Sequence, residues 1–206
     1  MEKDFKNEVI PKQETGITID TEKSIDLGTE EDAINFFQIA KMRLLNVNNW
    51  HHIAGALTAD FSLRDSAGKP VNRTAMKGDH FKIDIPGPGS KSGKGYDWIR
   101  IIDFQEKKEP GFESLAFTVR PSDNPENQTE HVSHFFSPES SSTFSVFRNK
   151  NKVTAGIYDR NTKPNTDGDT VIDKIRNTLV GAFGVSGGAK IQWKSLASAF
   201  IKKNDE

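Results

Sequence analysis

The sequence contains no cysteine. This absence excludes a disulfide scaffold, a thiol nucleophile and a thiolate metal site. The sequence also lacks an excess of one charge, because 28 Lys and Arg residues are balanced by 29 Asp and Glu residues, for a formal net charge of -1. Since basic and acidic residues are interleaved, no long-range field attracts nucleic acid or anionic lipid. We therefore expect no nucleic-acid partner.

Long hydrophobic runs are missing as well. No run approaches the roughly 20 apolar residues of a membrane span, and Met1 to Glu8 lacks the apolar core of a signal peptide. We expect a cytoplasmic protein without stable membrane insertion. The length of 206 residues fits one domain, since domains usually contain about 100 to 200 residues. Residues 1–14 are charged and aperiodic and predict a flexible tail, which leaves residues 15–206 as a single domain.

Helical periodicity occurs in two parts of the chain. Thr29 is a predicted N-cap, followed by acidic residues in the first turn and by apolar residues at steps of three and four up to Val47. Between Asp169 and Lys203, two further apolar stripes are separated by the segment Gly184 to Gly188. Because glycine costs about 1 kcal/mol inside a helix, we expect two closing helices joined by a hinge that could act as a gate.

Most of the remaining sequence alternates between apolar and polar residues, which is typical of strands joined by short turns. A helix with one apolar stripe must bury that stripe against another element, and an antiparallel sheet has a face to be covered. The pattern therefore predicts an α+β fold, in which a curved antiparallel sheet of seven or eight strands is closed by a C-terminal helix. The expected strands cover residues 15–20 with an extension to 27, 57–63, 81–85, 96–105, 112–120, 131–137, 143–148 and 153–158.

No catalytic motif is recognisable. The glycine-rich segment 87–95 lacks the spacing of a P-loop, because Gly95 follows Lys94 where a Ser or Thr is required, and it predicts a surface loop that could act as a lid. The pairs His51 and His52, and His131 and His134, do not point to one side of an element, so we expect no metal site. No Gly-x-Ser-x-Gly motif is present, and we expect no cofactor.

Two polar residues interrupt apolar strand faces. His134 shares a face with Phe136, and Arg100 lies between Trp98 and Ile102 on one face of its strand. Burying an unpaired guanidinium costs several kcal/mol, so Arg100 needs a partner or an exit to the rim of the sheet. An internal carboxylate, or the carboxylate or hydroxyl of a ligand, would satisfy it. For His134 the alternatives are a hydrogen-bonded core residue and a functional group.

The order of elements resembles that of a known superfamily. A strand, a helix ending at the Trp50 corner, an antiparallel meander that includes Asp79 to Ile85 and Tyr96 to Ile101, and a C-terminal helix resemble the helix-grip fold of the START-like, Bet v 1-like (SRPBCC) superfamily. That superfamily includes polyketide cyclases and lipid-transfer domains, whose sheet wraps the last helix and leaves an apolar cavity. The segment Gly184 to Gly188 and an eighth strand depart from that pattern. An NTF2-like cone, which lacks the long closing helix, is the alternative fold.

The resemblance implies a ligand cavity between the sheet and the closing helix. Its function would be the binding, and by extension transport or sensing, of a small hydrophobic molecule or lipid. One alternative is a cyclase- or hydrolase-like enzyme that uses His134 or an acid in the same cavity. The other is a protein-interaction module with a filled core. The residues expected to line the cavity are Trp98, Arg100, Ile102, Phe117, His134, Phe136, Phe183 and Trp193.

Overall fold

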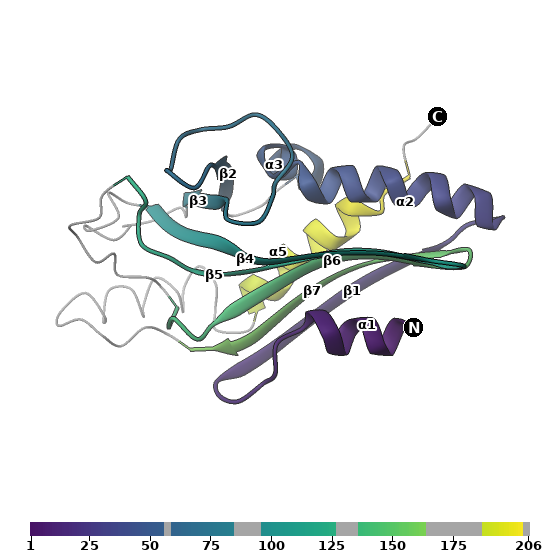
Figure 1. Cartoon of the computed structure of the whole chain (residues 1–206), viewed down its shortest axis with the longest axis horizontal. Helices are drawn as coiled ribbons and strands as arrows, with labels where there is room; N and C mark the ends of the chain where they lie inside the picture. Colours follow the sequence, from purple (N-terminus) through teal and green to yellow (C-terminus); the bar gives the residue numbers. More distant parts are fainter. Residues whose placement is uncertain (56–58, 85–95, 127–135, 164–186, 204–206) are drawn as a thin grey trace.

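The structure is a computed structural model that describes residues 1–55, 59–84, 96–126, 136–163 and 187–203 (Figure 1). Within these residues, seven strands form one antiparallel sheet in the order β1-β7-β6-β5-β4-β3-β2, so the edges of the sheet are β1 and β2. The strands are β1 (Ile17–Asp26), β2 (Asp60–Arg64), β3 (His80–Asp84), β4 (Tyr96–Glu109), β5 (Phe112–Pro121), β6 (Ser141–Asn149) and β7 (Lys152–Thr162).

The described helices lie on both sides of this sheet. Three of them, α2, α3 and α5, lie on one side, and α1 lies on the other (Figure 1). We call the side covered by α2, α3 and α5 the inner face and the side that carries α1 the outer face. The helices are α1 (Glu2–Val9), α2 (Glu30–Leu45), the short 3-10 helix η1 (Val47–Asn49), α3 (Trp50–Ala54) and α5 (Gly187–Phe200).

This arrangement confirms the predicted α+β fold class, with a curved antiparallel meander and a C-terminal helix. The helix α5 is the element that an NTF2-like cone lacks. It begins at Gly187, inside the segment where the sequence predicts a break, and the first predicted closing helix lies outside the described residues. The predicted eighth strand, residues 131–137, also lies almost entirely outside them.

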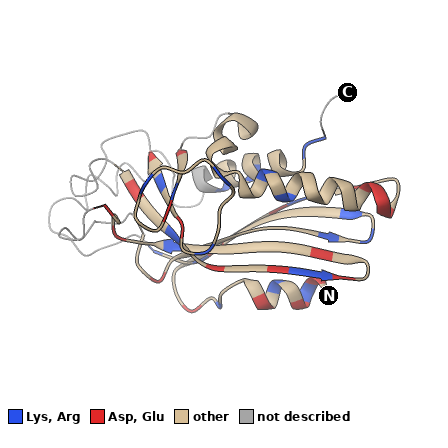
Figure 2. Cartoon of the chain, turned by 45° about the horizontal axis from the view of Figure 1, so that its top comes forward, with Lys and Arg blue, Asp and Glu red and all other residues tan. Residues whose placement is uncertain are grey.

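The start of α2 forms as the sequence predicts. The side chain of Thr29 accepts a hydrogen bond from the backbone N–H of Asp32 at 3.1 Å, which satisfies one of the free donors at the helix start. Three acidic residues occupy the first turn, where they meet the positive end of the helix dipole (Figure 2). The apolar stripe of the helix packs onto the inner face through Ala33, Phe36, Phe37, Ala40, Leu44 and Leu45.

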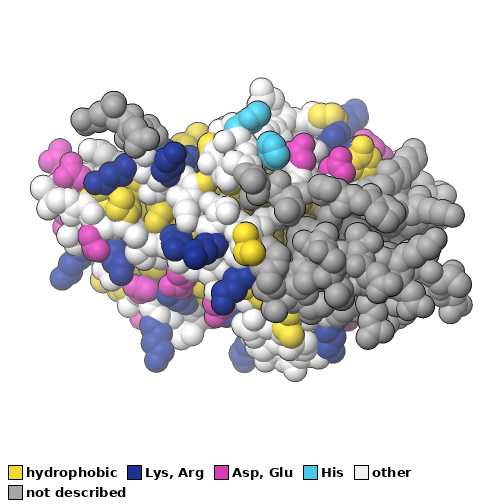
Figure 3. Space-filling model, turned by 180° about the vertical axis from the view of Figure 1, so that it is seen from behind, with side chains coloured by type: hydrophobic (Ala, Val, Ile, Leu, Met, Phe, Trp, Pro, Cys, Tyr) yellow, Lys and Arg dark blue, Asp and Glu magenta, His cyan; other side chains and the backbone are white. Residues whose placement is uncertain are grey.

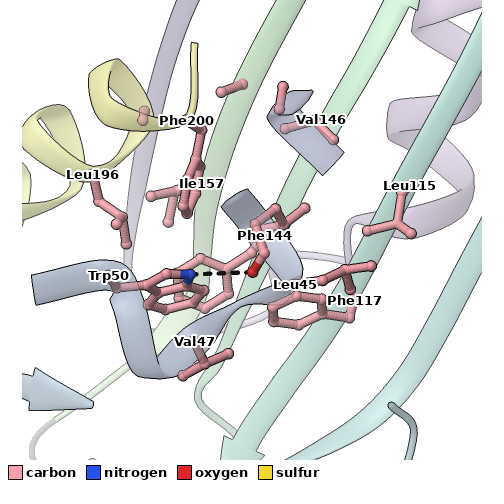
Figure 4. Packing of buried hydrophobic residues seen from close by; sticks show 14 of the residues in the cluster. Leu45, Val47, Trp50, Leu115, Phe117, Phe144, Val146, Ile157, Leu196 and Phe200 are labelled. Atoms are coloured by element: carbon pink, nitrogen blue, oxygen red, sulfur yellow. Dashed lines mark hydrogen bonds between the residues drawn. The ribbon is translucent and has the colours of Figure 1, made fainter. Parts of the chain in front are cut away.

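Trp50 lies at the centre of the inner core (Figure 4). Its ring centroid lies 5.1 Å from that of Phe144, 5.4 Å from that of Phe61 and 5.6 Å from that of Phe200, so it joins the sheet to α5. The buried indole N–H donates to the carbonyl of Leu44 at 3.1 Å. The sequence predicts only a corner at Trp50, because the short helix α3 is too brief to show a periodicity.

The segment for which the sequence predicts a flexible tail, residues 1–14, contains the helix α1. Phe5 and Val9 are buried on the outer face, where they pack against Phe112, Ala116 and Phe147. The hydroxyls of Thr118 and Thr143 also lie within hydrogen-bond distance of the Val9 carbonyl. Two apolar residues four positions apart form a narrow helical stripe, and the many charges around them hide it in the sequence.

A buried ion network fixes α2 to the sheet. Arg148 on β6 donates through Nη2 to Glu113 on β5 at 3.1 Å and through Nη1 to Glu30 on α2 at 2.9 Å. Arg148 and Glu113 are both buried, so the removal of Arg148 would leave the Glu113 carboxylate buried without its arginine partner. The network sets the position of α2 over the inner face.

The packing of Trp50 leads to a prediction about stability. Replacing Trp50 with Ala removes the largest side chain of the inner core and should lower the free energy of unfolding by about 3 to 5 kcal/mol. Urea denaturation followed by circular dichroism measures this change. Ile191→Ala is the control, because Ile191 is 69% exposed on α5 and its truncation should change stability by less than about 0.5 kcal/mol. Equal effects of the two substitutions would contradict the central position of Trp50.

Candidate functional site

Two of the three predicted cavity residues on β4 lie on the outer face. The cross-strand partner of Ile99 is Phe81, which belongs to the inner core, so Ile99 and Ile101 point inward. Trp98 and Arg100 therefore point outward, and Arg100 is exposed. A bulge follows, and Ile102 is the residue within it that has no cross-strand partner. The sequence prediction therefore assigned Trp98 and Arg100 to the wrong face of the sheet. Alternation of apolar and polar residues shows that a strand has two faces, but it does not show which face the helices cover.

Two of the predicted residues meet on the inner face. Phe117 packs 5.5 Å from Phe144, and Trp193 of α5 packs edge-on against the same Phe144 ring at 5.5 Å. Phe136 is half-buried. His134 and Phe183 lie outside the described residues. Ligand binding by this set stays a prediction.

The inner face also carries a buried acid, Asp159, which is not among the predicted site residues. Along β7 the inward positions are Val153, Ala155 and Ile157, and the next is Asp159, which is only 5% exposed. The hydroxyl of Ser142 on β6 donates to Asp159 Oδ1 at 2.6 Å. The indole N–H of Trp193 donates to Oδ2 at 2.7 Å, so three elements converge on one carboxyl group.

Burial changes the acidity of this group. Removal from water disfavours the charged form and raises the pKa of Asp159 from 3.8 to about 6. The hydrogen bonds from Ser142 and Trp193 and the charge of Arg160 oppose this rise, because they favour the carboxylate. Asp159 can therefore exchange a proton at mildly acidic pH, an unusual property for an aspartate in a protein core.

A signal for Asp159 is present in the sequence. The predicted strand ended at Tyr158, but the alternation of Val153, Ala155 and Ile157 continues for one more step to Asp159. An acid at the next inward position of a strand is a candidate for a functional group, since an unpartnered buried carboxylate is costly. The contacts with Ser142 and Trp193 depend on tertiary structure and have no sequence signal.

Other candidate features among the described residues are weaker. A surface groove of about 370 Å³ is lined by Leu27, Gly28, Asp32, Asn35, Phe36, Ile39 and Lys203, and Asp159 is not among its residues. Within the described ranges, no group of three His, Asp or Glu residues is placed to hold a metal ion. No helix in those ranges is long and apolar enough to cross a membrane. On the face shown in Figure 3, basic and acidic side chains are interspersed.

Comparisons with known proteins give similarity at the level of solved structures. No protein-family model matches the sequence, and a search of the curated proteins found no match. A hypothetical protein of Helicobacter pylori is 10% identical, with coverage of 93% of this chain and 92% of that chain and a TM-score of 0.45. Norcoclaurine synthase of Thalictrum flavum is 8% identical, with coverage of 91% and 88% and a TM-score of 0.38. A major latex-like protein of Panax ginseng is 14% identical, with coverage of 82% and 96% and a TM-score of 0.33. Similarity this low leaves function to be argued from the residues of this chain.

The raised pKa of Asp159 leads to a prediction about stability and pH. The folded protein binds this proton more tightly than the unfolded chain does, so the contribution of Asp159 is most favourable below pH 3.8 and declines as the pH rises to about 6. The decline is on the order of 3 kcal/mol. In the wild type, the free energy of unfolding should therefore fall as the pH rises from 4 to 6.5, and in Asp159→Asn this fall should be absent. Urea denaturation at each pH measures the difference.

Asp103→Asn is the matched control for this measurement. Asp103 lies on the same sheet, but a hydrogen bond from Gln105 lowers its pKa below 3.8. The contribution of Asp103 to stability is present above pH 3.8 and is lost only at lower pH. Its replacement should therefore leave the dependence of the free energy of unfolding on pH unchanged above pH 4.5. Identical slopes for the wild type and Asp159→Asn would contradict a raised pKa at Asp159.

Proposed function

We propose that this protein binds a small, largely apolar molecule between the inner face of the sheet and α5, with Asp159 as the polar group that orients it. The single observation that supports the proposal is the placement of Asp159 on an apolar face, where it contacts Ser142 and Trp193. Sites for small molecules are mostly apolar and contain a few fixed polar groups. Asp159 and its neighbours have this composition.

The aromatic rings around Trp193 suggest the apolar part of the ligand. Phe144 lies 5.5 Å and Phe61 lies 6.4 Å from the Trp193 ring, and all three side chains belong to the inner side of the protein. Flat aromatic side chains offer a large contact area to a planar or aliphatic group. We expect a ligand with an aromatic or aliphatic body.

The chemistry of Asp159 suggests the polar part of the ligand. Each carboxylate oxygen accepts one hydrogen bond from the protein and retains a further lone pair. The group can therefore accept a hydrogen bond from a hydroxyl or an amine of the ligand. When protonated, it can instead donate a hydrogen bond to a carbonyl.

The centre of the inner face is a less favourable place for the ligand. Around Trp50, the rings of Phe61, Phe81, Phe117, Phe144 and Phe200 lie within 6.5 Å of the indole. Packing of this kind is typical of a structural core. A ligand is therefore expected beside Trp193 and Asp159. Joint packing of Trp98, Phe117 and Trp193 would favour the protein-interaction alternative, but the pairing of Trp98 with Lys82 puts Trp98 on the outer face.

A second candidate function is acid–base catalysis at the same place. The observation that favours it is the pKa of Asp159, about 6, since a general acid or base works best with a pKa near the working pH. In that case Asp159 would exchange a proton with the bound molecule, and Ser142 and Trp193 would hold the carboxyl group in position. An enzyme would lose turnover in Asp159→Asn while retaining part of its affinity for the substrate.

Binding of 1-aminoanthracene tests the proposed function. This fluorophore combines an apolar aromatic body with an amine donor, and its emission rises in apolar surroundings. We expect saturable binding by the wild-type protein and binding weaker by about ten-fold or more in Asp159→Asn, because one charge-assisted hydrogen bond is lost. Asp103→Asn should bind like the wild type. Absence of saturable binding, or equal affinity in Asp159→Asn, would contradict the proposal.

A further inference from the structure

The outer face of the sheet carries a row of basic residues. Arg64 on β2 pairs across the strands with His80 on β3, His80 pairs with Arg100 on β4, and Arg100 pairs with Arg120 on β5. Direct cross-strand partners point to the same side of a sheet, so four basic side chains lie next to one another. Neighbouring strands are about 4.8 Å apart, so the guanidinium groups of Arg100 and Arg120 can reach one common point.

The arginines of this row have no acidic partner among the described residues. None of the ion pairs formed within the described ranges includes Arg64, Arg100 or Arg120. By contrast, Arg160, on the same outer face, is paired with Asp20. Like charges directly opposite each other destabilise a sheet, so the row carries an energetic cost.

Unsatisfied donors gather at the same place. Within the described residues, seven buried side-chain polar atoms lack a hydrogen-bond partner, and four of them belong to the row or to the positions beside it. Trp98 and Ser122 are the residues beside it, linked by a hydrogen bond of 3.0 Å from the Ser122 N–H to the Trp98 carbonyl. We call these residues and the row the arginine patch. The four atoms are Arg64 Nε, Trp98 Nε1, Arg120 Nε and Ser122 Oγ.

The charges of Asp65 and Asp79 act on His80, and the charge of Glu139 acts on Arg120. All three carboxylates already have hydrogen-bond partners, which for Glu139 include Ser137. Asp79 accepts two hydrogen bonds from Arg73, at 2.6 and 2.8 Å, and a third from the N–H of Met76. One oxygen of Asp65 accepts from two backbone N–H groups of its own turn, each at 2.9 Å. These acids stabilise loops, and none of them forms an ion pair with an arginine of the row. Burial lowers the pKa of His80, so the charge of the patch comes from the arginines.

A bound oxyanion would compensate both the arginine charges and the unsatisfied donors of the patch. It neutralises guanidinium groups that repel each other, and it accepts hydrogen bonds from donors that lack an acceptor. A phosphate group offers several acceptor oxygens, and Arg holds such a group in a fixed geometry. Arg100 is the exposed member of the row, so a ligand would meet it first, while Trp98 is 1% exposed and lies behind.

We propose that the arginine patch binds the phosphate group of a small molecule through Arg100 and Arg120, with the Trp98 indole N–H beside the bound oxygens. The patch lies on the face of the sheet opposite to Asp159, so the two sites are separate and can be tested separately. The inference does not depend on the function proposed for the inner face.

The three indole N–H groups of the protein provide the test. In a spectrum that correlates ¹H and ¹⁵N, Trp50 and Trp193 are internal references, because their N–H groups already have acceptors at 3.1 and 2.7 Å. Titration with inorganic phosphate should shift the Trp98 signal saturably and leave the other two in place. Sodium chloride at equal ionic strength should not reproduce the shift. No shift at Trp98, or an equal shift with chloride, would overturn the proposal.

Variants separate a binding role from a structural one. Arg100→Gln and Arg120→Gln should each weaken phosphate binding by about ten-fold or more, since each removes a charge-assisted hydrogen bond. Each should also raise the melting temperature slightly at low salt without phosphate, because a repulsion is removed. Arg160→Gln, which removes an arginine already paired with Asp20, should leave the Trp98 titration unchanged. A lower melting temperature with unchanged phosphate affinity would make the row structural and overturn the proposal.

A further arm of the experiment identifies the source of the phosphate group. Phosphatidylcholine vesicles with and without phosphatidic acid are sedimented with the protein. We expect the protein to stay in the supernatant in both cases. A lipid phosphate fixed in a flat membrane can contact the exposed Arg100, but it cannot pass Arg100 to reach Arg120 and Trp98, as a small phosphate is proposed to do. Co-sedimentation that requires phosphatidic acid and is lost in Arg100→Gln would overturn the assignment to a small soluble molecule.

Discussion

The burial of Trp50 is the interaction on which the rest of the fold depends. A curved sheet with an apolar inner face must be covered, and one large ring there contacts residues of four strands and of α5. The ring can be fully buried because the carbonyls of Arg43 and Leu44, at the end of α2, accept its N–H. The same side chain therefore positions α2, α3 and α5 together, and the position of Trp193 over Asp159 follows from that of α5.

The polar groups on the two faces of the sheet have different surroundings. On the inner face, helices exclude water, so the polar groups there, Asp159 and the Arg148–Glu113 pair, are held by defined hydrogen bonds. On the outer face, α1 covers the apolar cluster of Phe112 and Phe147. No ion pair within the described parts of the chain includes an arginine of the patch. This contrast within one sheet makes the patch a candidate binding surface.

The helices and strands could be predicted from local patterns in the sequence. The positions of the candidate functional residues depend on tertiary contacts, which these patterns do not show. The N-cap at Thr29 and the hairpin between β6 and β7 depend on neighbouring residues, so they could be predicted. The direction of the β4 side chains depends on its pairing with β3 and on a bulge near Ile102, and neither appears in the alternation. For the same reason Arg100, expected inside, lies outside. Asp159 could have been found by extending one strand, but its partner Trp193 could not.

The central claim is that the inner face of the sheet is a structural core around Trp50 and a binding surface beside Asp159. Intermolecular nuclear Overhauser effects between bound 1-aminoanthracene and the aromatic rings of the protein test it most directly. We expect contacts with Phe144 and Trp193 and none with Trp50. Contacts confined to Phe36 and Ile39, which line the surface groove beside α2, would contradict the claim.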